Sequence, residues 1–333
     1  NMAMQPFKMM VGDMVNEKQK GLAYSIQSFL CNAGSLVGFL FPFIFTWIGI
    51  SNIAPQGVVP DSVIYSFYIG AAILILCVIY TTVKVKEMPP AEYAEYHGIT
   101  EEEEKEKINM VKLLVKAPKA FWTVGLVQFF CWFAFMFMWT YTNGSVAANV
   151  FDAPTVETVV NGVSKVMLDT KSIQYQDAAD WVGVLFAVQA IGSVLWAVCI
   201  PLFKDRKLIY SLSLVLGGLG FISTYFVHNQ YVLFISFLLI GCAWAAMLAL
   251  PFTILTNALS GGHMGTYLGL FNGTICIPQI VAASLGGSIL ALFTPKGMLP
   301  PEINMLVMAG VMLIIGAVCV YLIKETKGEQ AKA

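Results

Sequence analysis

The chain has 333 residues, of which 58% are apolar and 12% are charged, against about 25% charged residues in a typical soluble domain. Its mean hydropathy is +0.74, and its 19 basic and 20 acidic residues nearly cancel. These values exclude an ordinary soluble domain and give no sign of a nucleic-acid partner. The expected fold class is therefore an all-α membrane protein.

In chain order, residues 1–15 come first, and they supply only about half of the roughly 20 apolar residues that a spanning helix needs. We therefore expect eight complete transmembrane helices plus half of a ninth, in a chain that is the C-terminal part of a longer protein. The eight complete spans are expected at residues 21–48, 62–83, 120–142, 181–203, 208–227, 231–256, 264–293 and 304–323.

Lysine and arginine gather in alternate loops, as the positive-inside rule expects of cytoplasmic loops. If the loop at 14–21 is cytoplasmic, the opposite loops contain only Lys165, Lys171 and Lys296. This distribution predicts a multi-pass protein of the cell membrane, or of the inner membrane in a bacterium. Its C-terminus is then cytoplasmic.

Residues 85–119 form the clearest internal boundary, because Pro89 and Pro90 interrupt a helix and a charged run follows them. Two helix bundles joined by such a linker suggest a transporter with two six-helix halves. The expected parts are the end of an N-terminal bundle at 1–84, a cytoplasmic linker at 85–119, a C-terminal six-helix bundle at 120–327 with an outer loop at 143–180, and a cytoplasmic tail at 328–333.

No signature of an enzyme is visible. The three histidines, His97, His228 and His263, lie between the expected spans, so they cannot form a metal cluster inside the membrane. No phosphate-binding Gly-Lys-Ser/Thr loop occurs, which argues against direct use of ATP. All seven cysteines lie within expected spans, which argues against a disulfide framework. We expect no cofactor, and transport driven by an ion gradient remains.

Polar residues inside the spans are the candidates for binding. Lys8 would cost about 2.5–3.5 kcal/mol at the bilayer centre, so it is expected to face a cavity or a counter-ion, or else to snorkel to the cytoplasmic edge. Asp13, at a helix end, is expected to act as a latch. Planar amides beside indole rings suit a neutral polyol. The amides are Asn32, Gln128, Gln189, Asn272 and Gln279, and the aromatic residues are Trp132, Tyr141, Trp181, Trp196 and Trp244.

Several motifs resemble those of the sucrose/proton symporters, which belong to the glycoside–pentoside–hexuronide cation symporter group of the major facilitator superfamily. The motif Gly265-x-x-x-Gly269-Leu-Phe-Asn272-x-x-x-x-x-Pro278-Gln279 is similar to a signature of that family's penultimate pair of helices. Residues 1–14 resemble its fourth helix. Further matches are Gly34 and Gly38 in the fifth helix, Gln128-Phe-Phe-x-Trp132 in the seventh, and Phe203-Lys-Asp205-Arg206-Lys207 after the eighth.

The resemblance implies a major facilitator fold, of which this chain holds the family's helices four to twelve. The residues it implies for substrate binding or coupling are Lys8, Asn32, Gln128, Trp132, Asn143, Asn272 and Gln279. Those implied for gating or a cytoplasmic latch are Asp13, Asp205 and Arg206. Two positions depart from the family, because Lys8 replaces an arginine and Asn143 replaces an acid. The proton-carrying acid of the fourth helix is expected just before Asn1.

The function expected from this resemblance is import of a neutral sugar by proton symport through alternating access. A disaccharide such as sucrose or maltose is the expected substrate. The protein is expected to be monomeric, with the lipid bilayer as its other partner. A sodium-coupled sugar symporter is the alternative, since other branches of the group use sodium. A non-transporting membrane sugar sensor is the alternative from a different class.

Overall fold

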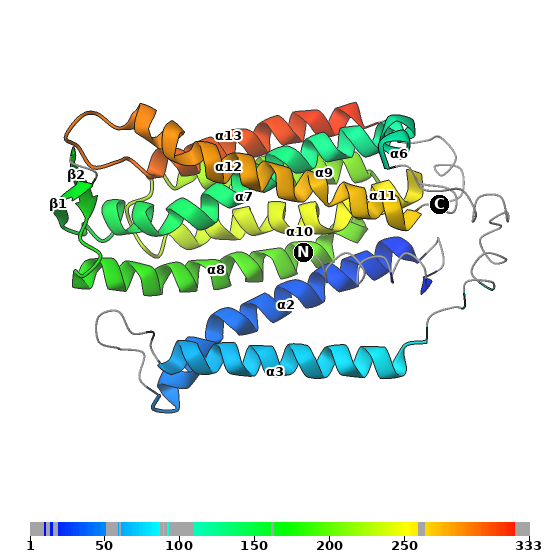
Figure 1. Ribbon diagram of the computed structural model, residues 1–333, viewed down its shortest axis with the longest axis horizontal. Coiled ribbons are helices and arrows are strands. Elements are labelled where there is room, and N and C mark those ends of the chain that lie inside the picture. Colours follow the sequence, from blue (N-terminus) through cyan, green and yellow to red (C-terminus); the bar gives the residue numbers. More distant parts are fainter. Residues whose placement is uncertain are drawn as a thin grey trace.

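The computed structural model describes residues 10, 14–15, 19–50, 59, 61–86, 89, 92, 110–160, 163–258 and 264–323. Eight long helices dominate this part of the chain (Figure 1). They are α2 (Lys20–Trp47), α3 (Asp61–Lys84), α7 (Lys119–Asn149), α8 (Ile173–Cys199), α9 (Arg206–Ser223), α10 (Leu233–Ala258), α12 (Gly273–Phe293) and α13 (Ile303–Cys319). The shorter elements are α6 (Met110–Lys116), α11 (Met264–Phe271), β1 (Thr155–Val160), β2 (Val163–Leu168), η1 (Ile200–Leu202) and η2 (Val320–Leu322).

The expected all-α membrane class is confirmed. Each of the eight expected spans coincides with a long helix, and α11 and α12 together fill the one expected at 264–293. Within the described residues, seven helical segments are long and apolar enough to cross a membrane, and α2 is the eighth long helix. Most of the expected linker at 85–119 lies outside the described residues.

The expected outer loop at 143–180 is much shorter than predicted. Helix α7 continues to Asn149 and α8 already begins at Ile173, where the Ser172 side chain accepts a hydrogen bond from the Tyr175 backbone N–H. The end of α7 is polar in sequence, yet it is packed in the bundle, with Ala147 fully buried. Tertiary packing thus extends this helix beyond its apolar run.

An antiparallel hairpin of β1 and β2 occupies much of what remains of that loop. In sequence, two runs rich in β-branched residues flank Asn161-Gly162, a pair typical of tight hairpin turns. Residues 143–180 were nevertheless expected to form a loop, and no hairpin was predicted there. The hairpin lies at the end of the bundle where α7 stops and α8 starts, which is called the hairpin end below (Figure 1).

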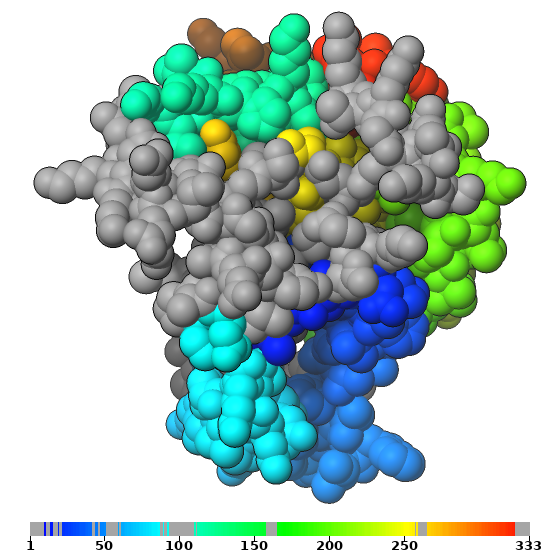
Figure 2. Space-filling view, turned by 90° about the vertical axis from the view of Figure 1, so that its right-hand side faces the viewer, coloured from blue at the N-terminus to red at the C-terminus, as the bar shows by residue number. Residues whose placement is uncertain are grey.

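Six of the spans form one bundle, and α7 and α10 are its most buried members. Helix α10 packs against α8 and α9, α13 packs against α7 and α9, and α12 packs against α7. In α7, 67% of the most apolar window is buried, whereas in α3 the figure is 6%, so α3 directs its side chains outward. Helix α2 packs between α3 and the pair α8 and α10. Figure 2 shows α2 and α3 projecting from one side of the bundle.

Helices α8 and α10 approach each other through their backbones. A Cβ atom on Gly192 of α8 would lie 2.6 Å from the carbonyl oxygen of Leu238, and one on Gly241 of α10 would overlap the carbonyl oxygen of Gln189. Any side chain at either glycine would push the helices apart. Small residues therefore fix both the spacing and the register of this pair.

Candidate functional site

Gln128 of α7 is fully buried, and its position follows from a proline on the neighbouring helix α10. Pro251 has no backbone N–H, so the carbonyl oxygen of Met247, four residues earlier, loses its helical partner. The Gln128 Nε2 donates a hydrogen bond of 2.8 Å to that oxygen. Since a carbonyl only accepts, the Gln128 Oε1 must face the other way, and it has no hydrogen-bond partner.

Asn32 of α2 repeats this arrangement. Its Nδ2 donates a hydrogen bond of 2.7 Å to the backbone oxygen of Ser28, one turn earlier, and the side chain is 1% exposed. The Asn32 Oδ1 is buried without a partner. Two amides on different helices therefore each use the nitrogen to anchor the side chain and leave the oxygen free as an acceptor.

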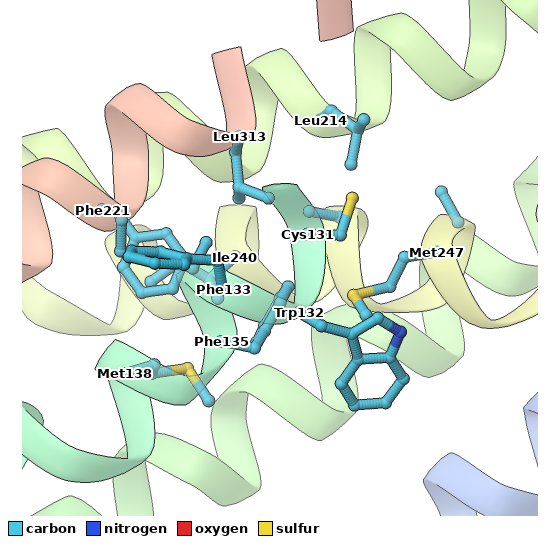
Figure 3. Close-up of a cluster of buried hydrophobic side chains, with 14 of the residues drawn as sticks. Cys131, Trp132, Phe133, Phe135, Met138, Leu214, Phe221, Ile240, Met247 and Leu313 are labelled. Atoms are coloured by element: carbon cyan, nitrogen blue, oxygen red, sulfur yellow. The ribbon is translucent and has the colours of Figure 1, made fainter. Parts of the chain in front are cut away.

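Trp132 lies one turn after Gln128 on α7 and contributes a donor. Its indole Nε1 is buried without a partner. Its ring packs edge-on against Trp244 of α10, with centroids 5.8 Å apart, and Trp244 in turn packs edge-on against Trp139 at 5.7 Å. Figure 3 shows the Trp132 indole extending away from Cys131 and Leu214. Aromatic faces and a free N–H group thus occur together.

The amide of Asn32 lies at the level of these tryptophans along the bundle. The Tyr24 and Phe252 rings, 6.3 Å apart, join antiparallel helices α2 and α10 (Figure 1). Eight residues onward in α2 is Asn32, and eight residues back in α10 is Trp244. Because the helices are antiparallel, both eight-residue intervals run about 12 Å in the same direction along the bundle. Asn32, Gln128 and Trp132, called the central polar layer below, therefore lie within about one helical turn of a common level.

Each free buried polar atom in this layer costs stability, about 1–3 kcal/mol if nothing replaces the lost water. Two are acceptors, the Asn32 Oδ1 and the Gln128 Oε1, and one is a donor, the Trp132 Nε1. Among the residues that the structure describes, no acidic or basic side chain is fully buried. The layer is therefore suited to an uncharged ligand that both donates and accepts hydrogen bonds.

Asn143 lies apart from this layer, near the hairpin end. It is eleven residues beyond Trp132 on α7, which corresponds to about 16 Å along the helix. Its Nδ2 donates a hydrogen bond of 3.0 Å to the Tyr175 hydroxyl of α8, and its Oδ1 is buried without a partner. This side chain joins the ends of α7 and α8.

Glu302, which was not among the predicted residues, lies at the same end. It precedes α13 by one residue, and its carboxyl group packs directly on Gly144 of α7, where a Cβ atom would overlap it. Burial raises the pKa of this carboxyl group from 4.5 to about 7. In the sequence, Glu302 follows Pro300-Pro301 and resembles an ordinary exposed loop residue. Its burial is visible only in the fold.

Asn272 and Gln279 lie on the α11–α12 segment, which packs against α7 through α12. The backbone of Asn272 is helical, with φ −58° and ψ −25°, and its carbonyl oxygen accepts from the Cys276 N–H. The helix thus continues through Asn272 and places the two amides two turns apart. Both are partly exposed, unlike the members of the central polar layer. Their contact with substrate stays a prediction.

The remaining predicted residues fall into two groups. Asp205 is the N-cap of α9, where its carboxylate accepts from the Lys207 and Leu208 backbone N–H groups, and the next residue, Arg206, is exposed. This capping accounts for Asp205 locally, and a latch at these two residues stays a prediction. Lys8 and Asp13 lie outside the described residues.

The described helices form a bundle of membrane spans that contains a buried, uncharged polar layer. The sequence profile of the Major Facilitator Superfamily matches residues 2–163 and 146–333, which together cover nearly the whole chain. The chain belongs to this superfamily of membrane transporters. A search of curated proteins found no match to the chain.

Proposed function

We propose that this transporter carries a neutral sugar, and that the central polar layer is part of its binding site. The observation that carries the proposal is the free hydrogen-bonding set of Asn32, Gln128 and Trp132. A sugar hydroxyl donates to an amide oxygen and accepts from an indole N–H, so sugars match both kinds of free group. The edge-packed tryptophans beside this set offer apolar faces to sugar C–H groups.

The resemblance to sucrose/proton symporters favours a disaccharide such as sucrose or maltose, imported by proton symport through alternating access. In that family the proton-carrying acid lies on the fourth helix, which residues 1–14 resemble. Asn143 cannot carry a proton, because an amide does not titrate in this range, and its distance from the layer also separates it from the proposed site. Sodium coupling is the alternative to be tested.

The test is uptake of labelled sucrose or maltose into proteoliposomes that contain the full-length protein. We expect an imposed pH gradient, acidic outside, to drive accumulation without sodium. Uptake that needs a sodium gradient and ignores the pH gradient would replace proton coupling with sodium coupling. Sugar binding with no uptake under any gradient would instead favour the membrane sensor.

A matched pair of variants tests the site itself. Trp132→Phe keeps the ring and removes the free N–H, so KM for the sugar should rise about fivefold to tenfold, the effect of one lost hydrogen bond. Trp181 was an aromatic candidate in the sequence, but its N–H is already used by the Gln230 carbonyl oxygen at 3.1 Å, so Trp181→Phe is the control and should keep the wild-type KM. If both variants keep the wild-type KM, the central polar layer is not the sugar site.

A further inference from the structure

Ser193 of α8 behaves unlike most buried hydroxyl groups in this protein. A serine or threonine within a helix usually donates to the carbonyl oxygen one turn earlier. Ser145 donates to Tyr141 at 2.7 Å and Ser213 donates to Ile209 at 2.6 Å. Ser193 is 0% exposed, yet its Oγ has no hydrogen-bond partner. Its hydroxyl is therefore buried and available.

The contact between α2 and α8 places this hydroxyl opposite Asn32. The two helices run in opposite directions (Figure 1), and the Phe39 and Phe186 rings are 5.8 Å apart. Asn32 is seven residues before Phe39, and Ser193 is seven residues after Phe186. Each step is two turns, or about 10 Å, and returns to the same helix face. Both positions therefore lie on the facing sides of α2 and α8, at one level.

The register of α8 and α10 gives the same level independently. The Ser193 backbone nitrogen lies 2.7 Å from where a Cβ atom of Gly241 would be, so Ser193 is level with Gly241. Trp244 is three residues further along α10, which is less than one turn. Ser193 thus belongs to the same level of the bundle as the central polar layer, on a helix that the layer did not include.

We infer that Ser193 is a substrate-contacting residue and forms, with Asn32, a second hydroxyl-binding point of the site. A sugar hydroxyl seated between α2 and α8 donates to the Asn32 Oδ1 and accepts from the Ser193 Oγ–H. The inference rests on the proposed sugar transport. It adds to that proposal the two residues, Asn32 and Ser193, that hydrogen-bond to one hydroxyl group of the sugar. Since α2 precedes the predicted linker and α8 follows it, the bound sugar connects the two expected halves.

The test combines Ser193→Ala with a panel of monodeoxy analogues of the transported sugar, measured as uptake by the full-length protein. We expect Ser193→Ala to raise KM for the parent sugar about fivefold to tenfold. For one monodeoxy analogue the variant and the wild type should have the same KM, because the hydroxyl that Ser193 contacts is already missing. Asn32→Ala should become insensitive to the same hydroxyl.

Stability without sugar separates this role from a structural one. Ser193→Ala removes a hydroxyl that has no partner, so the variant should unfold in detergent at the wild-type temperature or above it. Ser211→Ala is the control, because it breaks a hydrogen bond of 3.1 Å to the Ala317 carbonyl oxygen and should unfold earlier with KM unchanged. Addition of the parent sugar should then stabilise Ser193→Ala less than it stabilises the wild type.

These measurements distinguish failure of the proposed sugar transport from failure of the proposed role of Ser193. A wild-type protein that takes up no sugar rejects the proposed function, and with it the role of Ser193. Sugar uptake by the wild type with an unchanged KM in Ser193→Ala rejects the role of Ser193 alone. A KM that rises equally for every analogue also rejects it, since the serine would then act through helix packing.

Discussion

The hydrogen bond between Gln128 and Met247 yields a coupled pair of mutations. Gln128→Leu keeps the size of the side chain but removes the donor to a buried carbonyl oxygen that Pro251 has deprived of its helical partner. Leaving this oxygen unpaired costs about 1–3 kcal/mol. Loss of the unpartnered Gln128 Oε1 offsets part of that cost. The expected net destabilisation is therefore about 1–2 kcal/mol.

Pro251→Ala changes this cost, because an alanine N–H at that position can donate to the Met247 oxygen. In the Pro251→Ala background, Gln128→Leu should therefore cost about 1 kcal/mol less than in the wild type. The assay is thermal unfolding of the two single variants, the double variant and the wild type in detergent. A difference of 1 kcal/mol shifts Tm by about 2 °C in a protein of this size. Strictly additive shifts would refute the account, since they would mean that Pro251 does not create the need for Gln128.

Three further predictions concern stability. Because the folded pKa of Glu302 is about 7 and its ordinary value is 4.5, the folded state binds the proton more tightly. The free energy of unfolding should therefore fall by at most about 3 kcal/mol as pH rises from 4.5 to 7, and it should level off above pH 7. A Glu302→Gln variant whose free energy of unfolding falls with pH as steeply as that of the wild type would contradict this. Gly241→Ala should lower Tm by several degrees, because its Cβ overlaps the Gln189 carbonyl oxygen, and Gly287→Ala, with nothing within 4 Å, should not. Asp205→Ala should cost about 1 kcal/mol through loss of the α9 cap, and unchanged unfolding would exclude that role.

The helices were predictable because crossing a bilayer imposes a length and a composition that hydropathy records directly. The expected span at 304–323 and the helix α13 with η2 differ by one residue at each end. Prediction failed where polar residues remain helical through packing, as at the end of α7. The hairpin was missed although Asn161-Gly162 marks it in the sequence.

The residue types of the candidate site were visible in the sequence, but their positions relative to one another were not. Asn32 and Gln128 were predicted as polar amides inside apolar helices, and Trp132 was predicted for its aromatic face and by resemblance. The structure places the three near one level, and their contact with substrate stays a prediction. Asn143 was predicted by resemblance, and it lies near the hairpin end, where its contact with substrate stays a prediction. The sequence does not distinguish Ser193, because a lone serine in a helix normally donates its hydroxyl hydrogen to the backbone carbonyl oxygen one turn earlier. Only the unmet hydrogen bond in the fold distinguishes it.

The backbone contact of α8 with α10 has a mechanical consequence. No side chains lie between the backbones at Gly192 and Gly241. Rotation of one helix against the other would therefore bring backbone atoms into steric conflict. We expect α8 and α10 to move together as one unit, and α2 packs against both of them. Any movement of α2 during the transport cycle is therefore a movement against both helices together, with Asn32 and Ser193 along the contact between α2 and α8.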